Sequence, residues 1–339
     1  MNFTSDNAYG ASAEILAALV AANDGTVPSY GGDAITARLT ARFCEIFERE
    51  VAVFPVVSGT AANALALATL CPPYGAVLCH QESHIALDEC AAPEFFTGGG
   101  RLVLLPGEGG KIAAAAIEAA LPQYRRGIHS SKPSVVSITQ ASELGMVYRP
   151  DEVAALAACA HTNGMTLHMD GARFANALAH LGCSPADLTW RAGVDALSFG
   201  ATKNGALLAE AVVFFGDARD FEYRRKQAGH LISKMRFLSA QLEAYLKDGS
   251  WLKTAARANA LAQRLGEGLA GTAGAQLAYP VEANGVFVRL PNATVARLRQ
   301  RGARFLDWAQ PSDGRTLIRL VCSFATPEED IAKFLEAAR

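Results

Sequence analysis

Along residues 50–200, short runs of apolar residues alternate with longer stretches in which apolar residues recur every three or four positions. The short runs, bounded by glycine, proline or polar residues, predict buried strands, and the longer spacing predicts helices. The predicted strands are 51–57, 76–79, 101–105, 135–139, 166–169 and 194–199. The predicted helices among them are 58–70, 85–92, 112–121 and 151–162. Repeated strand-helix units predict a mostly parallel sheet covered by helices.

One apolar run departs from this alternation. The run 211–215 follows the strand 194–199 with only a loop between them. Such a loop is too short for the crossover that joins parallel strands, so these two strands are expected to pair antiparallel. The sequence therefore predicts an α/β fold with a mostly parallel sheet, covered by helices, that contains one antiparallel strand.

The two ends of the chain have a different character. Residues 1–40 form an N-terminal arm with a helical run, 11–22, and a turn-rich piece; we expect it to pack over a larger domain or a neighbouring subunit. Residues 41–248 are the predicted large α/β domain, which ends in a long basic helix, 221–246. Residues 249–339 alternate helices and strands in a pattern that predicts a small α+β domain.

Composition excludes several classes of protein. Half of the 339 residues are apolar, and 31 basic and 33 acidic residues are interspersed for a net charge of −2. No basic stripe is present for nucleic acid, no apolar run is long enough to span a membrane, and no signal peptide precedes the arm. We therefore expect a cytoplasmic protein. The seven cysteines are scattered and odd in number, so we expect reduced thiols rather than disulfides or a zinc site.

The candidate chemistry begins at the segment 198–205, SFGATKNG, which follows a predicted strand. It presents Lys203 at the carboxyl end of that strand, where open α/β sheets bind ligands. A lysine that is partly desolvated loses its proton readily and can form a Schiff base with an aldehyde cofactor. By itself, a loop lysine is more often a solvated surface charge.

Two further groups favour a Schiff-base role for Lys203 over a solvated surface charge. Ser58, Gly59 and Thr60 open a helix directly after a strand, and such a helix start binds anions such as phosphate, although Ser58 can equally be a simple helix cap. Asp170 lies at the tip of another predicted strand. Pyridoxal phosphate needs a lysine for its aldehyde, a helix start for its phosphate and a carboxylate for its ring nitrogen. The three groups together predict this cofactor.

Rival interpretations of the same residues have distinct signatures. His80 and His84 are four apart and could share a metal ion, but His80 ends a strand and no third ligand is obvious nearby. A phosphate-binding NTPase would need a Gly-Lys-Ser/Thr ending that the loop after residue 57 lacks. Transamination or β-elimination on the same cofactor stays open, because a fold does not fix a reaction.

At this point the sequence resembles the low-specificity L-threonine aldolases, fold type I pyridoxal phosphate enzymes of the aspartate aminotransferase superfamily; L-phenylserine aldolase is a close relative. The resemblance covers essentially the whole chain. It is carried by 58–63 (SGTAAN), His84, 167–173 (LHMDGAR), 198–205, 229–240 (GHLISKMRFLSA) and 318–321 (IRLV). One segment departs from the family pattern. Residues 140–145, QASELG, stand where many relatives have ENTHNG, which leaves open which groups shape the pocket near the phenolic oxygen of the cofactor.

The resemblance implies a role for each residue around the cofactor. Lys203 is the implied Schiff-base residue, and 58–60 hold the phosphate. Asp170 is placed on the ring nitrogen and His84 is stacked on the ring face. Arg173 is placed beside both the ring and the substrate carboxylate.

The substrate side follows in the same way. The resemblance implies that Ser5 and Arg319 grip the carboxylate of an amino acid substrate, and a strand arginine that faces inward does need an anion as partner. Tyr30, Lys226 and Arg236 are implied to reach the site, by themselves or across a subunit boundary. The assembly would be a homodimer or a homotetramer with active sites near the subunit interface.

The implied reaction is retro-aldol cleavage of L-threonine, L-allo-threonine or a related β-hydroxy-α-amino acid to glycine and an aldehyde. A base must remove the proton of the β-hydroxyl group. His84 is the favoured base because an imidazole titrates near working pH, and His129 or a bound water is the alternative. His84 can equally be only a stacking wall, and His129 can equally be an ordinary loop histidine.

Overall fold

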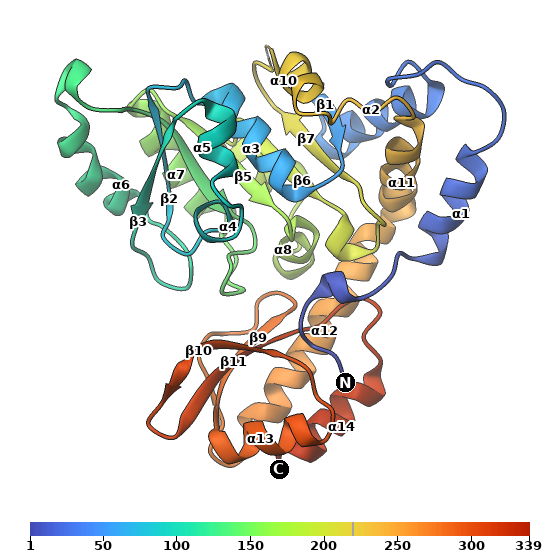
Figure 1. Ribbon diagram of the computed structural model, residues 1–339, viewed down its shortest axis with the longest axis vertical. Helices are drawn as coiled ribbons and strands as arrows, with labels where there is room; N and C mark the ends of the chain where they lie inside the picture. Colours follow the sequence, from blue (N-terminus) through green and yellow to red (C-terminus); the bar gives the residue numbers. More distant parts are fainter. Residues whose placement is uncertain (219) are drawn as a thin grey trace.

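The computed structural model describes residues 1–218 and 220–339, and the chain builds two β-sheets that lie one above the other in Figure 1. The larger sheet has seven strands in the order β1-β7-β6-β5-β4-β2-β3. Its strands are β1 (Ala52–Val56), β2 (Gly75–His80), β3 (Arg101–Leu105), β4 (Lys132–Thr139), β5 (Thr166–Gly171), β6 (Ala196–Gly200) and β7 (Glu210–Phe214).

The predicted antiparallel strand is confirmed. β7 pairs antiparallel with β1 on one side and with β6 on the other, whereas the neighbours from β6 to β3 are all parallel. The carboxyl ends of β1, β2, β4, β5 and β6 therefore meet at one edge of the sheet. This α/β sheet, parallel except for one strand, is the fold class that the sequence predicts.

Helices cover both faces of the large sheet. Alternate residues of each strand point to opposite faces: Leu167 and Leu197 join the core beneath α2, α7 and α8, whereas Val77 and Val212 pack towards α3. The helices of this part of the chain are α1 (Ala13–Ala22), α2 (Ala34–Phe47), α3 (Gly59–Leu70), α4 (His84–Leu87), α5 (Ala92–Thr97), α6 (Ala114–Ala120), α7 (Pro150–Thr162), α8 (Phe174–Leu181), α9 (Pro185–Leu188), α10 (Phe221–Gln227) and α11 (Arg236–Leu246).

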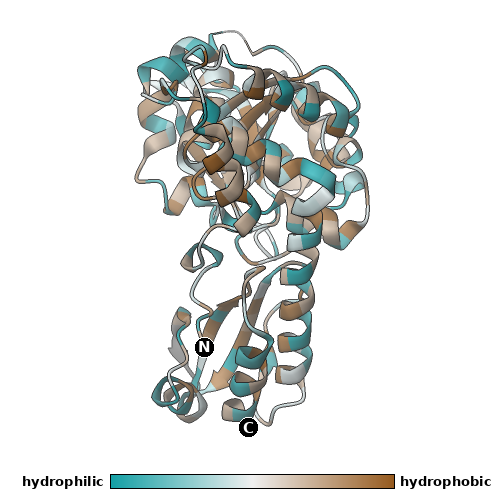
Figure 2. Ribbon diagram, turned by 90° about the vertical axis from the view of Figure 1, so that its right-hand side faces the viewer, coloured by the Kyte–Doolittle hydropathy of each residue, from teal (hydrophilic) through white to brown (hydrophobic). Residues whose placement is uncertain are grey.

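The smaller sheet is antiparallel throughout and has the order β10-β11-β9-β8. Hydropathy colouring places its apolar residues on the strands and leaves hydrophilic residues on the outward faces of the helices beside it (Figure 2). The elements of this part are α12 (Ser250–Ala270), β8 (Gln276–Leu277), β9 (Gly285–Pro291), α13 (Asn292–Gln300), β10 (Leu306–Ser312), β11 (Arg315–Val321) and α14 (Glu328–Ala338).

Two segments run between the sheets. The long helix α12 buries Trp251 and Ala255 in the core of the large sheet and Leu261 and Leu265 in the core of the small one (Figure 1). At the other end of the sequence, Phe3 is fully buried in the small core. The N-terminal arm then continues through η1 (Asp6–Ala8) to α1, which packs against α11 beside the large sheet.

Two local predictions are wrong, and two strands were not predicted. The predicted helix 85–92 is two short helices, α4 and α5, because Cys90 and Ala91 take left-handed backbone conformations between them. The predicted helix 221–246 is also two, α10 and α11, since the chain turns at Gly229, whose φ is +77°. The short strand β8 and the strand β10 were not predicted. None of the helices in the described ranges is both long and apolar enough to cross a bilayer.

Candidate active site

A cavity of about 390 Å³ opens at the edge of the large sheet where the parallel strands end. Its position agrees with the general rule that open α/β sheets bind ligands beyond the carboxyl ends of their strands. The lining residues that matter for the chemistry are Ser58, Gly59, Thr60, His84, Asp170, Ser198, Lys203 and Glu210. The structure therefore brings the predicted lysine, helix start, histidine and aspartate together around one cavity.

Lys203 is held in place by its neighbour in the short turn η5 (Thr202–Asn204) after β6. The side-chain amide of Asn204 donates to the hydroxyl of Tyr245 and to the carbonyl of Trp251, both at 2.8 Å. Because these bonds fix the turn to buried aromatic residues, the backbone of Lys203 is rigidly placed at the cavity. The side chain of Lys203 therefore starts from a fixed point at the cavity.

Glu210 lies on the neighbouring strand β7, next to the same turn. Its Oε2 atom accepts a hydrogen bond of 2.7 Å from the backbone N–H of Ala201. Burial raises the pKa of Glu210 to about 7, although the nearby Lys203 opposes that shift. A carboxyl group that titrates near neutral pH thus borders the cavity behind the lysine.

Ser58 both caps the helix α3 and stands at the cavity. Its hydroxyl accepts a hydrogen bond of 3.3 Å from the backbone N–H of Ala61, as a helix cap does. Gly59 and Thr60 follow as the first residues of a 12-residue helix, and a Cβ added at Gly59 would meet no atom within 4 Å. The remaining N–H groups and the positive end of the helix dipole make this open position suited to an anion.

Asp170 ends β5 and its two carboxylate oxygens are held from different sides. Oδ1 accepts from the backbone N–H of Ala172 at 3.0 Å, and Oδ2 accepts from the side-chain amide of Asn63 at 2.8 Å. Behind it, the imidazole of His168 lies between the hydroxyls of Ser137 and Ser198, at 2.9 and 3.0 Å. Burial lowers the pKa of His168 to about 4, so this ring is neutral and leaves Asp170 free to act on a bound cation.

His84 is the first residue of α4 and lines the cavity with a side chain that is 31% exposed. Its Nδ1 atom lies 2.8 Å from Oε1 of the fully buried Glu89. The hydrogen bond to Glu89 raises the pKa of His84 above its ordinary value, although partial burial opposes this. A histidine in this setting can take up a proton at the cavity near neutral pH.

Arg173 makes a buried, bidentate ion pair with Asp6 from the N-terminal arm. The Nε and Nη2 atoms of Arg173 lie 2.9 and 3.1 Å from the two carboxylate oxygens of Asp6, and Asn284 donates a third hydrogen bond to Asp6 at 3.0 Å. Burial acts to raise the pKa of Asp6, but the charges of Arg173 and Lys203 outweigh it and hold that pKa below 3.8. The positive charge that was predicted for the substrate carboxylate is thus already paired within the chain.

Ser5 is next to Asp6 in the N-terminal arm, and Arg319 contacts the same arm at Thr4. Ser5 caps η1 directly before Asp6, and Nη2 of Arg319 donates to the carbonyl of Thr4 at 3.4 Å. The guanidinium of Arg319 lies over the ring of Trp308, and its Nε atom is buried without a hydrogen-bond partner among the described residues. Burial lowers the pKa of Arg319. A buried guanidinium with an unused N–H is suited to binding a carboxylate.

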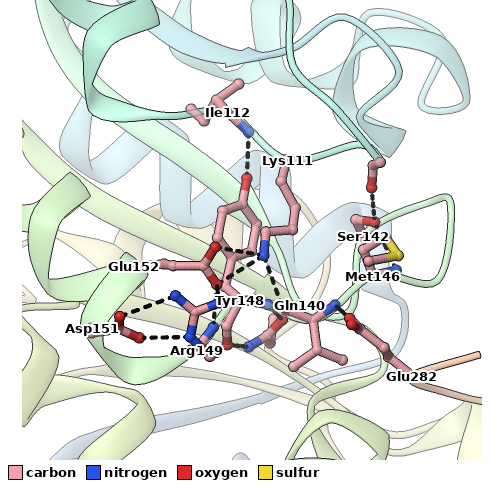
Figure 3. Close-up of polar contacts among 12 residues, drawn as sticks. Lys111, Ile112, Gln140, Ser142, Met146, Tyr148, Arg149, Asp151, Glu152 and Glu282 are labelled. Atoms are coloured by element: carbon pink, nitrogen blue, oxygen red, sulfur yellow. Dashed lines mark hydrogen bonds and ion pairs between the residues drawn. The ribbon is translucent and has the colours of Figure 1, made fainter. Parts of the chain in front are cut away.

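The segment 140–145, which departs from the family pattern, is fixed by the polar network in Figure 3. Gln140 exchanges hydrogen bonds of 2.8 and 3.0 Å with the backbone of Tyr148, and the hydroxyl of Ser142 donates to the carbonyl of Gly109 at 2.7 Å. Both side chains therefore serve the loop itself. The group that this loop turns towards Arg173 is Glu143, whose pKa is raised by burial.

Seven predicted residues do not line this cavity: Ser5, Arg173 and Arg319, described above, and Tyr30, His129, Lys226 and Arg236. His129 ends the turn η3 (Gly127–His129), beside the fully exposed Ile128. The amine of Lys226 lies over the ring of Tyr30 at 4.6 Å, and Arg236 donates to backbone carbonyls of the arm. As for the rival metal interpretation, both ring nitrogens of His80 already have backbone partners, the N–H of Glu82 and the carbonyl of Gly107 after β3. Within the described ranges, no group of three or more ligands could hold a metal ion.

Five polar residues of the site were not predicted: Asp6, Asn63, Glu89, Glu143 and Glu210. Two of them carried a signal. Asn63 is a polar residue within the otherwise apolar helix α3, and such a residue needs a buried partner. Asp6 directly follows Ser5, which the resemblance singled out. Glu89 and Glu143 lie in segments whose backbone path the sequence does not reveal.

The chemistry of these groups fits pyridoxal 5′-phosphate. The cavity offers an amine at Lys203, an open helix start at Gly59 and the side-chain carboxyl group of Asp170. The unused N–H of Arg319 provides for a carboxylate that the chain itself does not supply. These are the donors that the cofactor and an amino acid substrate require.

Comparisons with known proteins agree with this geometry. A low-specificity L-threonine aldolase from a Pseudomonas species is 49% identical over 329 residues, which cover 96% of this chain and 93% of that protein. The low-specificity L-threonine aldolase of Pseudomonas aeruginosa is 48% identical, and the match covers 99% of this chain and 96% of that protein. A solved structure of the threonine aldolase of Leishmania major has a TM-score of 0.94 at 30% identity, covering 99% and 98% of the two chains.

A family model described as beta-eliminating lyase matches residues 2–293. The family, the fold type and the cofactor class that the sequence implied are thereby confirmed. The chain belongs to the beta-eliminating lyase family and, within it, to the low-specificity L-threonine aldolases, which are pyridoxal phosphate enzymes.

Proposed function

We propose that this protein cleaves L-threonine, L-allo-threonine or a related β-hydroxy-α-amino acid between Cα and Cβ, giving glycine and an aldehyde. The observation that carries the proposal is that an amine, a carboxylate, an imidazole and a helix start surround one cavity: Lys203, Asp170, His84 and Gly59. When bound, pyridoxal phosphate supplies the electron sink that accepts the electron pair of the broken bond. The chain's own residues hold the cofactor, orient the substrate and accept the proton of the β-hydroxyl group.

Three groups are proposed to hold the cofactor. The amine of Lys203 binds its aldehyde carbon. The N–H groups at Gly59 and Thr60, together with the hydroxyl of Ser58, bind its phosphate. Asp170 accepts a hydrogen bond from its ring nitrogen and so keeps that nitrogen protonated, because an ionised carboxylate favours a positive charge beside it.

The substrate carboxylate is proposed to bind at Arg319, with Ser5 beside it. Arg319 has a buried, unused N–H, whereas Arg173 is occupied by Asp6 in the structure. Arg173 then acts beside the ring and keeps the N-terminal arm against the site. Fixing the carboxylate sets the direction in which the Cα–Cβ bond stands, which is the main way a protein selects the bond to be broken.

His84 is proposed to take the proton from the β-hydroxyl group. Its ring lines the cavity, and the hydrogen bond to Glu89 raises its pKa, which makes the imidazole a stronger base. The alternatives, a stacking role for His84 and a base at His129 or a bound water, predict a different result. A His84→Phe variant keeps a stacking ring and would keep its turnover if stacking were the role.

The assembly is proposed to be a homodimer or a homotetramer with sites near the subunit interface. Support comes from three residues that do not line the cavity of their own subunit but lie at the N-terminal arm, where they could reach the site of a neighbouring subunit. They are Tyr30, Lys226 and Arg236. Several large apolar side chains are also exposed, among them Val20, Tyr74, Leu87, Phe95, Ile128 and Tyr223. Light scattering on the purified protein gives the molar mass and so tests the assembly.

The domain boundaries near residues 40 and 249 and the cytoplasmic location are likewise proposals. The seven cysteines are free thiols, as suits a reducing compartment, although only three of them are fully buried. Limited proteolysis would reveal whether the chain is cut near the proposed boundaries. Fractionation of cells that express the protein would test its location.

The deciding experiment is incubation of the protein and pyridoxal phosphate with L-threonine. Release of acetaldehyde with an equal amount of glycine supports the proposal. Release of 2-oxobutanoate would instead indicate β-elimination, and transamination would require a keto acid as acceptor. Parallel assays with L-allo-threonine and L-phenylserine identify the preferred side chain. Hydrophobic pockets separate such neighbours only weakly, so we expect all three to be cleaved.

A further inference from the structure

Glu89 links His84 to Asp170 through a buried chain of hydrogen bonds. Its side chain is fully buried, and its Oε1 atom lies 2.8 Å from Nδ1 of His84 and accepts from Nδ2 of Asn63 at 2.8 Å. The same amide nitrogen of Asn63 donates to Oδ2 of Asp170 at 2.8 Å. A continuous chain of hydrogen bonds therefore runs from the imidazole at the cavity to the carboxylate on β5.

We propose that Glu89 is a positioning residue for His84: its carboxylate keeps the proton of the neutral imidazole on Nδ1, so that Nε2 presents its lone pair to the cavity. The same carboxylate then stabilises the positive charge after Nε2 has taken up a proton. This inference rests on the proposed function, since it explains how His84 can accept the β-hydroxyl proton. It assigns Glu89 no contact with the substrate.

The argument for the tautomer is one of donors and acceptors. A carboxylate can only accept, so the 2.8 Å contact at Nδ1 requires a proton on that nitrogen. A neutral imidazole carries one N–H, which leaves Nε2 as the acceptor. A free neutral histidine usually carries its proton on Nε2. The buried carboxylate of Glu89 reverses that preference for His84.

The buried carboxylate of Glu89 and its partner Asn63 contribute little to the stability of the fold. Oε2 of Glu89 and Oδ1 of Asn63 are both buried without a hydrogen-bond partner among the residues that the structure describes. Leaving a buried polar atom unpaired costs free energy, and burial raises the pKa of Glu89. A carboxylate kept in such a place at a cost to folding is better explained by its effect on His84 than by stability.

Four charged groups face His84 from the elements around it. Glu89 raises the pKa of His84 most, Asp170 from β5 and Glu143 from the loop after β4 raise it further, and Lys203 after β6 lowers it. Among the residues that the structure describes, Glu89 is the one that hydrogen-bonds the ring of His84. Removing its charge should therefore change the titration of His84 more than a change at any of the other three would.

The first test measures the wild-type protein without cofactor and uses one variant only to assign a resonance. With ¹⁵N-labelled histidine, the nitrogen chemical shifts of His84 report which nitrogen carries the proton in the neutral ring, and His84→Asn identifies the resonance. We expect the proton on Nδ1. A proton on Nε2 of neutral His84 would overturn the proposal.

The second test compares Glu89→Gln with Glu152→Gln. Glu152 is the control, since it accepts hydrogen bonds from the charged side chain of Lys111 and the backbone N–H of Arg149 but lies outside the cavity (Figure 3). In Glu89→Gln the pKa of His84, followed by NMR, should fall by about one to three units. It should stay unchanged in Glu152→Gln. An unchanged pKa in Glu89→Gln would contradict the inference.

Activity provides a third reading that separates the two proposals. His84 must be unprotonated to act as a base, so kcat/KM falls as the pH drops through its pKa. We expect this acidic limb to move to lower pH in Glu89→Gln and to stay in place in Glu152→Gln. A wild-type protein that does not cleave L-threonine would refute the proposed function alone, because the NMR experiments decide the role of Glu89 independently.

Discussion

The ion pair between Asp6 and Arg173 allows a sharp test of how the N-terminal arm is held. The two side chains are 1% and 15% exposed and meet through two hydrogen bonds. In Asp6→Asn the guanidinium stays buried and loses its countercharge. Breaking one half of a buried pair costs about 3–5 kcal/mol, because the remaining charge is left uncompensated. We therefore expect the variant to be much less stable than the wild type.

The measurement is urea unfolding at pH 7, followed by tryptophan fluorescence at a single protein concentration. For a chain of this size we take a denaturant slope of about 3 kcal/mol per molar urea, so the unfolding midpoint should fall by about 1 to 1.7 M. Asp151→Asn is the control: it removes a carboxylate from an arginine pair on the exposed surface, and its midpoint should not move measurably.

Two further observations would confirm the mechanism. The double variant Asp6→Asn with Arg173→Met should be more stable than Asp6→Asn alone, since no buried charge is then left unpaired. The pKa of Asp6 lies below 3.8 in the folded chain, so the stability from this pair is fully present above that value and is lost as the pH falls through the lowered pKa. A midpoint for Asp6→Asn equal to that of Asp151→Asn would refute the reasoning.

Three other expectations concern the cavity. Lys203→Ala should show no covalent adduct after borohydride treatment with pyridoxal phosphate, as judged by intact mass, and should lose nearly all cleavage; an adduct of wild-type yield would exclude Lys203 as the anchor. Arg319→Lys should raise KM for L-threonine by roughly tenfold or more, because it loses the planar N–H pair; an unchanged KM would place the carboxylate elsewhere. Gly200→Ala should unfold at a lower temperature by thermal denaturation, because its Cβ would lie 2.6 Å from the carbonyl oxygen of Ala172, whereas Gly216→Ala, with open space around it, should match the wild type; equal melting temperatures would contradict this.

Much of the large sheet could be predicted because its signals are local. The strand-helix alternation gave each parallel strand, and the short connection between residues 200 and 210 was enough to predict the antiparallel pairing of β6 and β7. The positions of Lys203, Asp170 and Gly59 at strand ends followed from the same pattern, since the carboxyl ends of parallel strands share one edge.

The errors arise where the local signal is weak or the partner is remote. The helical pattern of 221–246 hides the turn at Gly229, because a single glycine is tolerated in many helices. The partner of Arg173 is 167 positions away, and Asn284 is 278 positions from the same Asp6. Nothing in the spacing of the chain indicates such contacts. The sequence thus predicts which chemical groups reach the cavity, but not which of them neutralise one another.

Helix α12 and the N-terminal arm, which both run between the two sheets, determine how the subunit unfolds. α12 contributes Trp251 to one core and Leu265 to the other, and the arm places Phe3 and Ile15 in the same two cores. Neither sheet can lose its order without exposing apolar surface that belongs to the other. Melting should therefore be cooperative across the whole subunit, with a single calorimetric peak, even though the chain has two separate sheets.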